Sequence, residues 1–237
     1  MGLQMNGVVG DTKKSLAERA YEAIREAILT LRLEPGQAIY EAELGNMLEM
    51  SRTPIREAVR LLAMEELIEV LPQRGLKVAL ISEGKVEETR FVREILEIGA
   101  IRSVVQSWDS KQLQYQRLKR DVQANLEQQR QAQAEKNAAE FLVADEWFHR
   151  LLLQSTGNMT LVSMVTKMRY HLNRVRTLTL QEFQNSDSLI QEHEVLFDAI
   201  QGNDESTAIQ VLTAHLRRLN TDIQAVKQKY PSYFVNA

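Results

Sequence analysis

The sequence predicts a mainly α-helical protein with two domains, a winged helix-turn-helix followed by an antiparallel helical bundle. The first observation is the distribution of helix breakers. Between Lys85 and Tyr230 there is no proline and there are only three glycines, so this part of the chain is expected to form long helices. The second observation is that the first third contains three short amphipathic segments and then two β-prone runs around a glycine turn.

Local signals place the elements of the first third. Ser15 and Glu18 form a capping box, so a helix begins at Leu16. Ser51 can cap a third helix. Pro54 is tolerated in the first turn of that helix, because the backbone there needs no intrahelical hydrogen-bond donor. In order, we expect a helix from residue 16 that ends at 33–36, helices at 41–48 and 51–65, and strands at 67–71 and 76–81. This is the element order of a winged helix-turn-helix.

The rest of the chain predicts six helices, each with apolar residues at the helical period. Their expected ranges are 83–106, 110–134, 137–154, 161–180, 186–201 and 204–229. Amphipathic helices of this kind pack as an antiparallel bundle. The second of them is rich in glutamine, which indicates a solvated face formed by Gln123, Gln128, Gln129, Gln131 and Gln133. The expected domains are therefore a winged helix-turn-helix domain at 13–81 and an all-helical domain at 85–230.

Composition excludes several classes of protein. The 237 residues are 44% hydrophobic and 26% charged, as in an ordinary soluble globular protein. The chain contains no cysteine, which rules out a disulfide scaffold, a thiolate zinc finger and a cysteine nucleophile. No apolar run approaches the roughly 18 residues of a membrane span, and the N-terminal lysines follow the apolar residues, the reverse of a signal peptide. We therefore expect a cytoplasmic protein without a membrane partner.

The start of the third helix carries side chains suited to reading DNA. Recognition helices present short polar and guanidinium groups at the end that enters the major groove. The side chains at this end are those of Ser51, Arg52, Thr53 and Arg56. Arg74 lies at the expected hairpin tip, where it can reach a phosphate or the minor groove. Arginines four residues apart, such as Arg52 and Arg56, can also form no more than a solvated helix face. The preceding short helix and the following hairpin favour DNA recognition instead.

The DNA-binding domain is not basic overall. Residues 13–80 contain 10 Lys and Arg against 11 Asp and Glu. Affinity must therefore come from local arrangement, and we expect two copies to bind an inverted repeat in double-stranded DNA as a homodimer. The helical domain, with its broad apolar faces, is the expected dimerisation surface.

Several polar residues lie on apolar faces of the second domain. Asp145 and His149 are one turn apart on a face that also holds phenylalanines, and His193 and His215 lie among apolar residues. Such groups can converge as oxygen and nitrogen ligands of one metal ion. A single inward histidine is more often a hydrogen-bonded core residue, but four inward polar groups are costly unless they satisfy one another or share an ion. His171 also points inward and is a further candidate for lining a pocket.

The first third resembles the winged-helix domain of the GntR family of bacterial transcription regulators. Three segments carry the resemblance, LRLEPGQAI at 31–39, EAELGNMLEMSRTPIREAVRLLAMEELIE at 41–69 and QRGLKV at 73–78. The resemblance implies that Arg52 and Arg56 read bases. It also implies that Ser51 and Gly75 contact DNA. Some members have a further DNA-contacting arginine in the second helix, where this chain has Ala42.

The second part resembles the FCD domain, the ligand-binding domain of the FadR subgroup of that family. The segments that carry this resemblance are VREILEIGAI at 92–101, DEWFHRLLL at 145–153 and EHEVLFDAIQGNDESTAIQVLTAHL at 192–216. It implies a divalent metal, zinc or alternatively nickel or manganese, with the ligands Asp145, His149, His193 and His215. It also implies that Arg93 helps to hold a carboxylate effector. Because all four ligand positions are present, the metal-binding branch is favoured over the branch that binds acyl-CoA.

These features predict a DNA-binding transcription regulator, not an enzyme, that is controlled by a small carboxylate effector at the metal site. Tyr170, Arg174 and Arg176 are further candidates for contact with that ligand. Two alternatives stay open: the metal itself is the signal, or the chain is a metalloenzyme joined to a DNA-binding module, because a metal with open positions activates water. The absence of an H-E-x-x-H type of general base beside the ligands disfavours the enzyme.

Overall fold

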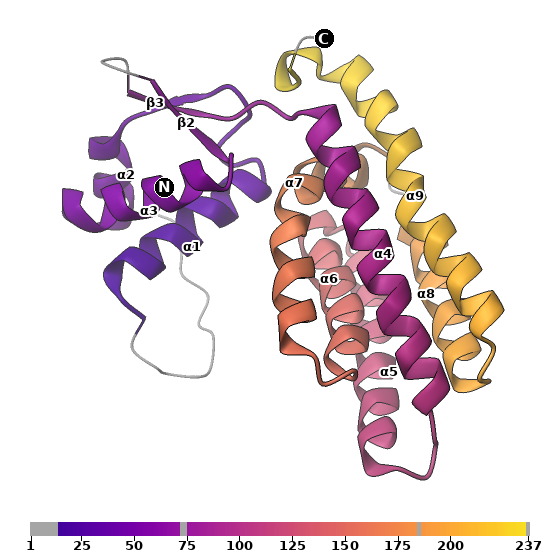
Figure 1. The fold of residues 1–237 in the computed structure, drawn as a ribbon. Helices are drawn as coiled ribbons and strands as arrows, with labels where there is room; N and C mark the ends of the chain where they lie inside the picture. Colours follow the sequence, from indigo (N-terminus) through magenta and orange to yellow (C-terminus); the bar gives the residue numbers. More distant parts are fainter. Residues whose placement is uncertain (1–13, 72–74, 184–185, 236–237) are drawn as a thin grey trace. The chain divides into compact units, whose positions relative to one another are not determined.

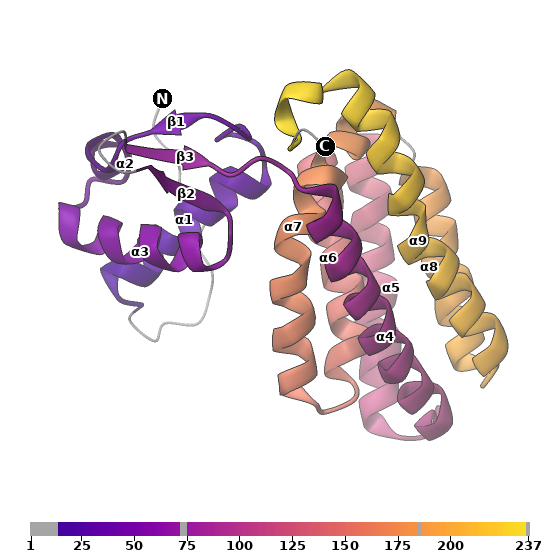
Figure 2. The same ribbon diagram turned by 45° about the horizontal axis from the view of Figure 1, so that its top comes forward.

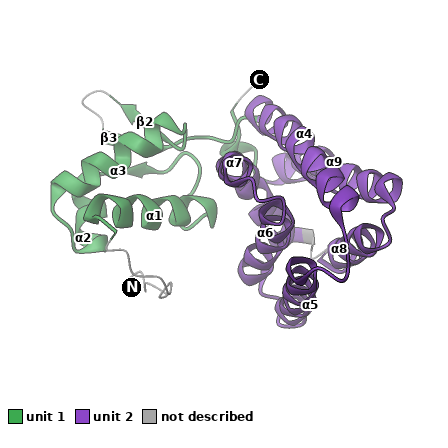
Figure 3. Ribbon diagram, turned by 60° about the horizontal axis from the view of Figure 1, so that its bottom comes forward, with its two compact units in different colours: residues 1–82, 230–237 green, residues 83–229 purple. Residues whose placement is uncertain are grey.

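A computed structural model describes residues 14–71, 75–183 and 186–235 of the chain (Figure 1). The chain divides into two compact units, unit 1 with residues 1–82 and 230–237 and unit 2 with residues 83–229 (Figure 3). Each unit buries apolar side chains of its own. No helix within the described ranges is long and apolar enough to cross a membrane.

Unit 1 is a winged helix-turn-helix, which confirms the predicted fold. Its elements are α1 (Leu16–Leu29), β1 (Ala38–Ile39), α2 (Glu41–Leu48), α3 (Arg52–Met64), β2 (Ile68–Leu71) and β3 (Gly75–Val78). The strands form one antiparallel sheet in the order β1-β3-β2, in which Leu76 pairs with Ile39 on one side and Val70 on the other (Figure 2). β1 is absent from the prediction, because two residues are too few to show a periodic pattern.

Packing of α1 against α3 determines which side of α3 is exposed. α1 begins at the predicted capping box, in which the Glu18 amide donates to Ser15 Oγ at 3.1 Å and the Ser15 amide donates to Glu18 Oε2 at 2.8 Å. Ile28 of α1 and Ile55 and Leu62 of α3 are completely buried. Because these residues turn one stripe of α3 inward, the opposite stripe faces solvent.

A tight turn joins α2 to α3. The Met50 amide donates to the Gly45 carbonyl at 2.9 Å, and Glu49 has a left-handed backbone conformation with a φ of 55°. A Cβ atom at residue 45 would lie 3.0 Å from the Met50 carbonyl oxygen, closer than real Cβ atoms normally approach. Glycine therefore allows the close turn that sets the start of α3.

Unit 2 is an all-helical bundle, as predicted (Figures 1 and 2). Its helices are α4 (Glu83–Ser107), α5 (Leu113–Ala134), α6 (Ala138–Gln154), α7 (Met159–Phe183), α8 (Ser186–Gln201) and α9 (Glu205–Lys229). The predicted ranges differ mainly at helix ends. For example, α5 begins three residues later than expected, because the Gln112 amide donates to the Asp109 carbonyl at 2.9 Å and the chain forms a turn first. One apolar cluster joins α4, α5, α6, α8 and α9 and includes the fully buried Phe148.

The chain returns to unit 1 after α9. A short 3-10 helix, η1 (Pro231–Tyr233), leads to a bridge between Ile81 and Phe234. The Ile81 amide donates to the Tyr233 carbonyl at 2.8 Å, and the Val235 amide donates to the Ile81 carbonyl at 3.0 Å. Phe234 is 2% exposed. This returning segment is a further feature that the sequence-based prediction lacks.

Candidate metal centre and DNA interface

Three helices bring four buried polar residues together. Asp145 and His149 lie one turn apart on α6, His193 lies on α8 and His215 on α9. All four are buried, and one potential ligand atom of each lies within 4.8 Å of the others. The four residues that the sequence singled out as metal ligands are thus neighbours in the fold, and this cluster can hold a metal ion.

The Nδ1 atom of each histidine in this cluster faces an acceptor outside it. His149 Nδ1 lies 2.7 Å from Glu97 Oε2, and His215 Nδ1 lies 2.8 Å from Glu192 Oε2. Ionised carboxylates only accept hydrogen bonds, so these imidazoles carry their proton on Nδ1. Each Nε2 atom then offers a lone pair to the centre of the cluster, the tautomer that a metal-binding histidine needs.

A chain of amides gives His193 the same orientation. The Ala144 carbonyl accepts from Asn125 Nδ2 at 2.9 Å, and Asn125 Oδ1 accepts from Gln129 Nε2 at 2.7 Å. Gln129 Oε1 is therefore the acceptor that faces His193 Nδ1 at 2.8 Å. The backbone carbonyl fixes the direction of the whole chain. Gln129 is completely buried, so the prediction that it belongs to a solvated glutamine face was wrong.

The inward atoms of the cluster lack donors. His149 Nε2 and His215 Nε2 lie 3.1 Å apart, and His193 Nε2 lies 3.5 Å from Asp145 Oδ1. Neither His193 Nε2 nor Asp145 Oδ1 has a hydrogen-bond partner among the described residues. Ligands of a tetrahedral zinc ion, each about 2.0–2.1 Å from the metal, lie about 3.4 Å from one another. The residues present therefore fit a divalent ion in both chemistry and spacing.

Burial and neighbouring charges set the protonation of the cluster. Burial lowers the pKa of His149 to about 3, although Glu97 opposes this shift, and burial also holds the pKa of His193 well below its usual range. Burial alone would raise the pKa of Asp145, but Arg176 holds that pKa well below its usual range by its charge and by a hydrogen bond of 2.6 Å. At neutral pH His149 and His193 are therefore neutral imidazoles and Asp145 is a carboxylate, the forms that bind metals.

Arg93 is connected to this cluster through Glu97. Arg93 Nε donates to Glu97 Oε1 at 2.5 Å, while Glu97 Oε2 faces His149. Burial lowers the pKa of Arg93 to about 10, so the side chain still carries its charge at neutral pH. The prediction placed Arg93 near the metal ligands, and in the structure Glu97 bridges Arg93 and His149. The prediction missed Glu97, although its spacing of four residues from Arg93 on one helix was a usable signal.

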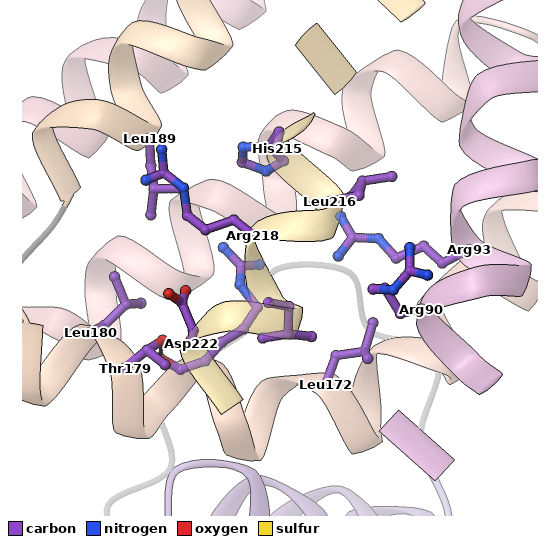
Figure 4. Close-up of a pocket in the computed structure, with 12 residues that line it drawn as sticks. Arg90, Arg93, Leu172, Thr179, Leu180, Leu189, His215, Leu216, Arg218 and Asp222 are labelled. Carbon is purple, nitrogen blue, oxygen red and sulfur yellow. Dashed lines mark hydrogen bonds between the residues drawn. The ribbon is translucent and has the colours of Figure 1, made fainter. Parts of the chain in front are cut away.

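A cavity with cationic walls adjoins the cluster (Figure 4). It is open to solvent, its empty space together with the solvent at its mouth is about 470 Å³, and its lining includes His215 of the cluster. Arginines dominate its charged lining, with one carboxylate from Asp222, and the arginines are Arg90, Arg93, Arg176 and Arg218. Of the further candidates from the sequence, Arg176 lines the cavity, whereas the described lining includes neither His171, Tyr170 nor Arg174. This arrangement suits a small anion.

The exposed side of α3 carries the predicted DNA-reading residues. Arg52, Thr53 and Arg56 are exposed, and the buried Pro54 and Ile55 face the core of unit 1. Arg56 Nε donates to Glu41 Oε2 at 2.8 Å, but the Arg56 side chain remains 65% exposed.

Ser51, Gly75 and Arg74 complete the predicted DNA set. Ser51 occupies the N-cap position of α3, but its side chain makes no cap hydrogen bond, contrary to the capping role expected for it. Gly75 has a φ of +95°, and a Cβ atom there would lie 2.9 Å from Tyr40 Cε1, so the fold itself requires glycine at the start of β3. Arg74 lies outside the described residues.

Comparisons with known proteins agree with both units. Residues 16–78 match the family model "Bacterial regulatory proteins, gntR family", and residues 88–218 match the FCD domain. A Streptomyces ambofaciens protein, an HTH-type transcriptional regulator in an unstable DNA locus, is 31% identical over 90% of this chain and 87% of its own length. The HTH-type transcriptional repressor RspR of Escherichia coli K12 is 28% identical over 92% of both chains.

A solved structure shows the same fold. E. coli McbR/YncC superposes with a TM-score of 0.76 at 19% identity, over 90% of this chain and 99% of that one. The matching families and the similar proteins are transcription regulators, which excludes the metalloenzyme alternative. The chain belongs to the GntR family of bacterial transcription regulators, with a GntR-type DNA-binding domain and an FCD domain.

Proposed function

We propose that operator binding by this regulator is controlled by a small carboxylate effector that binds beside a divalent metal ion in unit 2. The observation that carries this proposal is the convergence of three imidazole lone pairs and one carboxylate oxygen, each imidazole being held by a second hydrogen bond. Buried acceptors that face only one another are costly, whereas a shared cation satisfies all of them.

The donor set suits zinc, with nickel or manganese as alternatives. The ion would be held by Asp145, His149, His193 and His215. It would supply positive charge and coordination positions for an effector oxygen. Three neutral imidazoles and one carboxylate leave a divalent ion with one net positive charge, so an anion is attracted to it.

The arginines of the adjoining cavity support a carboxylate as the anion. Arg93 and Arg176 are each less than 10% exposed and line the same cavity as His215. Guanidinium groups bind carboxylates with two parallel hydrogen bonds, a geometry that ammonium groups do not offer. Each of these two arginines already donates to one carboxylate, but Arg93 is the residue that we expect to pair with the effector, because its buried Nη2 atom has no hydrogen-bond partner among the described residues.

We propose that Ser51, Arg52, Thr53 and Arg56 contact the operator, together with Arg74 and Gly75 of the hairpin. The exposed N-terminal turn of α3 supports this role, because its polar side chains face solvent while its apolar stripe is buried. The nearly neutral charge of the domain favours a homodimer that binds an inverted repeat, since two copies double the number of phosphate contacts.

A second candidate is a metal-sensing regulator. The observation that favours it is that four potential ligand atoms from protein side chains lie within 4.8 Å of one another, so a metal can bind without any effector. In that case metal occupancy alone would control the affinity for the operator.

A DNA-shift experiment separates the two candidates. Purified protein is titrated onto an operator found by in vitro selection, with a chelator, with zinc and with zinc plus each of a set of small carboxylates. We expect the shift to change with one class of carboxylate only when zinc is present. A response to zinc that no carboxylate modifies would instead establish the metal sensor.

Sedimentation of the free protein tests the dimer, and a monomer that binds a single half-site tightly would contradict it.

A further inference from the structure

A second arginine approaches the carboxylate that orients His149. Arg169 of α7 is 4% exposed, and its Nη2 atom lies 3.6 Å from Glu97 Oε1. The same oxygen accepts the hydrogen bond from Arg93 Nε at 2.5 Å. Arg93 and Arg169 therefore flank one buried carboxylate, whose other oxygen faces a histidine of the metal cluster.

These two arginines have unused donors. Nη2 of Arg93 and both Nη atoms of Arg169 are buried and have no hydrogen-bond partner among the described residues. Native proteins rarely leave buried N–H groups without an acceptor, and the cost is greatest for charged groups. Glu97 does not meet this demand, because the separation of 3.6 Å from Arg169 exceeds the length of a hydrogen bond.

The periodicity of α7 places Arg169 on the side of the cavity. Leu172 and Arg176 line the cavity, and Arg169 precedes them by three and seven residues on the same helix face. Arg169 therefore lies one helical turn before Leu172 on the same face of α7. Arg169 is not itself among the lining residues, but it approaches the same Glu97 oxygen as Arg93, which lines the cavity (Figure 4).

Buried positive charges outnumber buried negative charges in this region. Arg90, Arg93, Arg169 and Arg176 carry four buried positive charges, against three buried negative charges on Glu94, Glu97 and Asp145. A divalent ion raises the positive excess further. A dianion compensates more of this excess than a monoanion does, and its second acidic group can accept from the unused N–H groups.

We propose that Arg169, together with Nη2 of Arg93, forms a second anion subsite beside the metal centre, and that the effector is a small dicarboxylate. This inference rests on the proposed function, because it assumes that the first carboxylate of the effector binds at the metal. Arg169 determines the specificity for the second carboxylate. Arg93 contacts both ends of the ligand.

Titration calorimetry with acids of matched chain length tests the subsite. Full-length protein loaded with zinc is titrated at constant ionic strength with butyrate and succinate, and then with pentanoate and glutarate. We expect each dicarboxylate to bind at least tenfold more tightly than the matched monocarboxylate. In Arg169→Met this ratio falls to near one, while the affinity for the monocarboxylate and the zinc content by elemental analysis are unchanged. Arg169→Lys keeps a charge and restores part of the ratio.

The exposed Arg102 of α4 provides the matched control, since Arg102→Met removes an arginine outside the cavity and should leave the ratio as in the parent. Equal binding of both acids by the parent would overturn the subsite and leave the carboxylate effector intact. A parent that holds stoichiometric zinc and binds neither acid would overturn both proposals. A loss of affinity for both acids in Arg169→Met would show that Arg169 supports the site as a whole and would also overturn its role in specificity.

Discussion

The Nε2 atoms of His149 and His215 face each other at 3.1 Å, although the Nδ1 atom of each already faces a carboxylate. With both Nδ1 atoms protonated, the two Nε2 lone pairs have no proton between them and repel each other. Burial lowers the pKa of His149 to about 3, so this ring does not take up a proton at neutral pH to relieve the repulsion. A cation between the rings satisfies both lone pairs.

Replacing His193 and His215 by alanine should therefore remove the metal. We expect elemental analysis to find about one divalent ion per chain in the parent and almost none in the double variant. The shift of operator DNA without effector should persist, while the change caused by carboxylate disappears, because unit 1 keeps its own core. His171→Ala, which alters a buried histidine outside the cluster, is the control and should retain the metal. Stoichiometric metal in the double variant would eliminate this site.

Removing the amide that orients His193 should weaken metal binding without removing a ligand. Gln129→Ala leaves His193 Nδ1 without its acceptor, so we expect the affinity for zinc to fall about 10–100-fold, as is typical for partners behind metal ligands. Competition with a chromophoric chelator measures this change. Gln128→Ala, one residue earlier on the exposed face of α5, should have no effect. Equal affinities in the parent and in Gln129→Ala would show that the amide chain does not orient the ring.

The sequence predicts the candidate metal-binding cluster better than its surroundings. Asp145 and His149 share a helix face whatever the tertiary structure, and apolar neighbours show that this face turns inward. Gln129 could not be assigned in this way, because its burial depends on which helix lies beside α5, and local periodicity does not contain that information. The same reason explains why the pairing of Glu192 with His215 was not predicted. The β1 strand and the bridge from Ile81 to Phe234 are too short to leave a periodic signal.

Arg52→Ala and Arg56→Ala should each weaken specific operator binding by about 1–3 kcal/mol, the range expected for an arginine that reads a base. The free energy of unfolding should change little, because both side chains are exposed and the ion pair between Arg56 and Glu41 is at the surface. Fluorescence anisotropy with operator DNA and with scrambled DNA measures the specific part. Arg32→Ala, which removes an exposed arginine outside α3, is the comparison. If either α3 variant binds the operator like the parent at physiological salt, α3 is not the recognition helix.

The returning C-terminal segment should stabilise the DNA-binding unit. Phe234 is 2% exposed, and the amides on either side of the bridge are hydrogen-bonded. We expect Phe234→Ala to lower the free energy of unfolding of unit 1 by about 3 kcal/mol, the low end for burial of a phenylalanine, because a segment near the chain end can readjust. Hydrogen exchange should then become faster at the Ile81 amide, which donates to Tyr233. Val235→Ala is the matched control, since that side chain is 48% exposed and its loss should change stability by less than about 0.5 kcal/mol. Unchanged exchange at Ile81 in Phe234→Ala would mean that the segment lies on unit 1 without stabilising it.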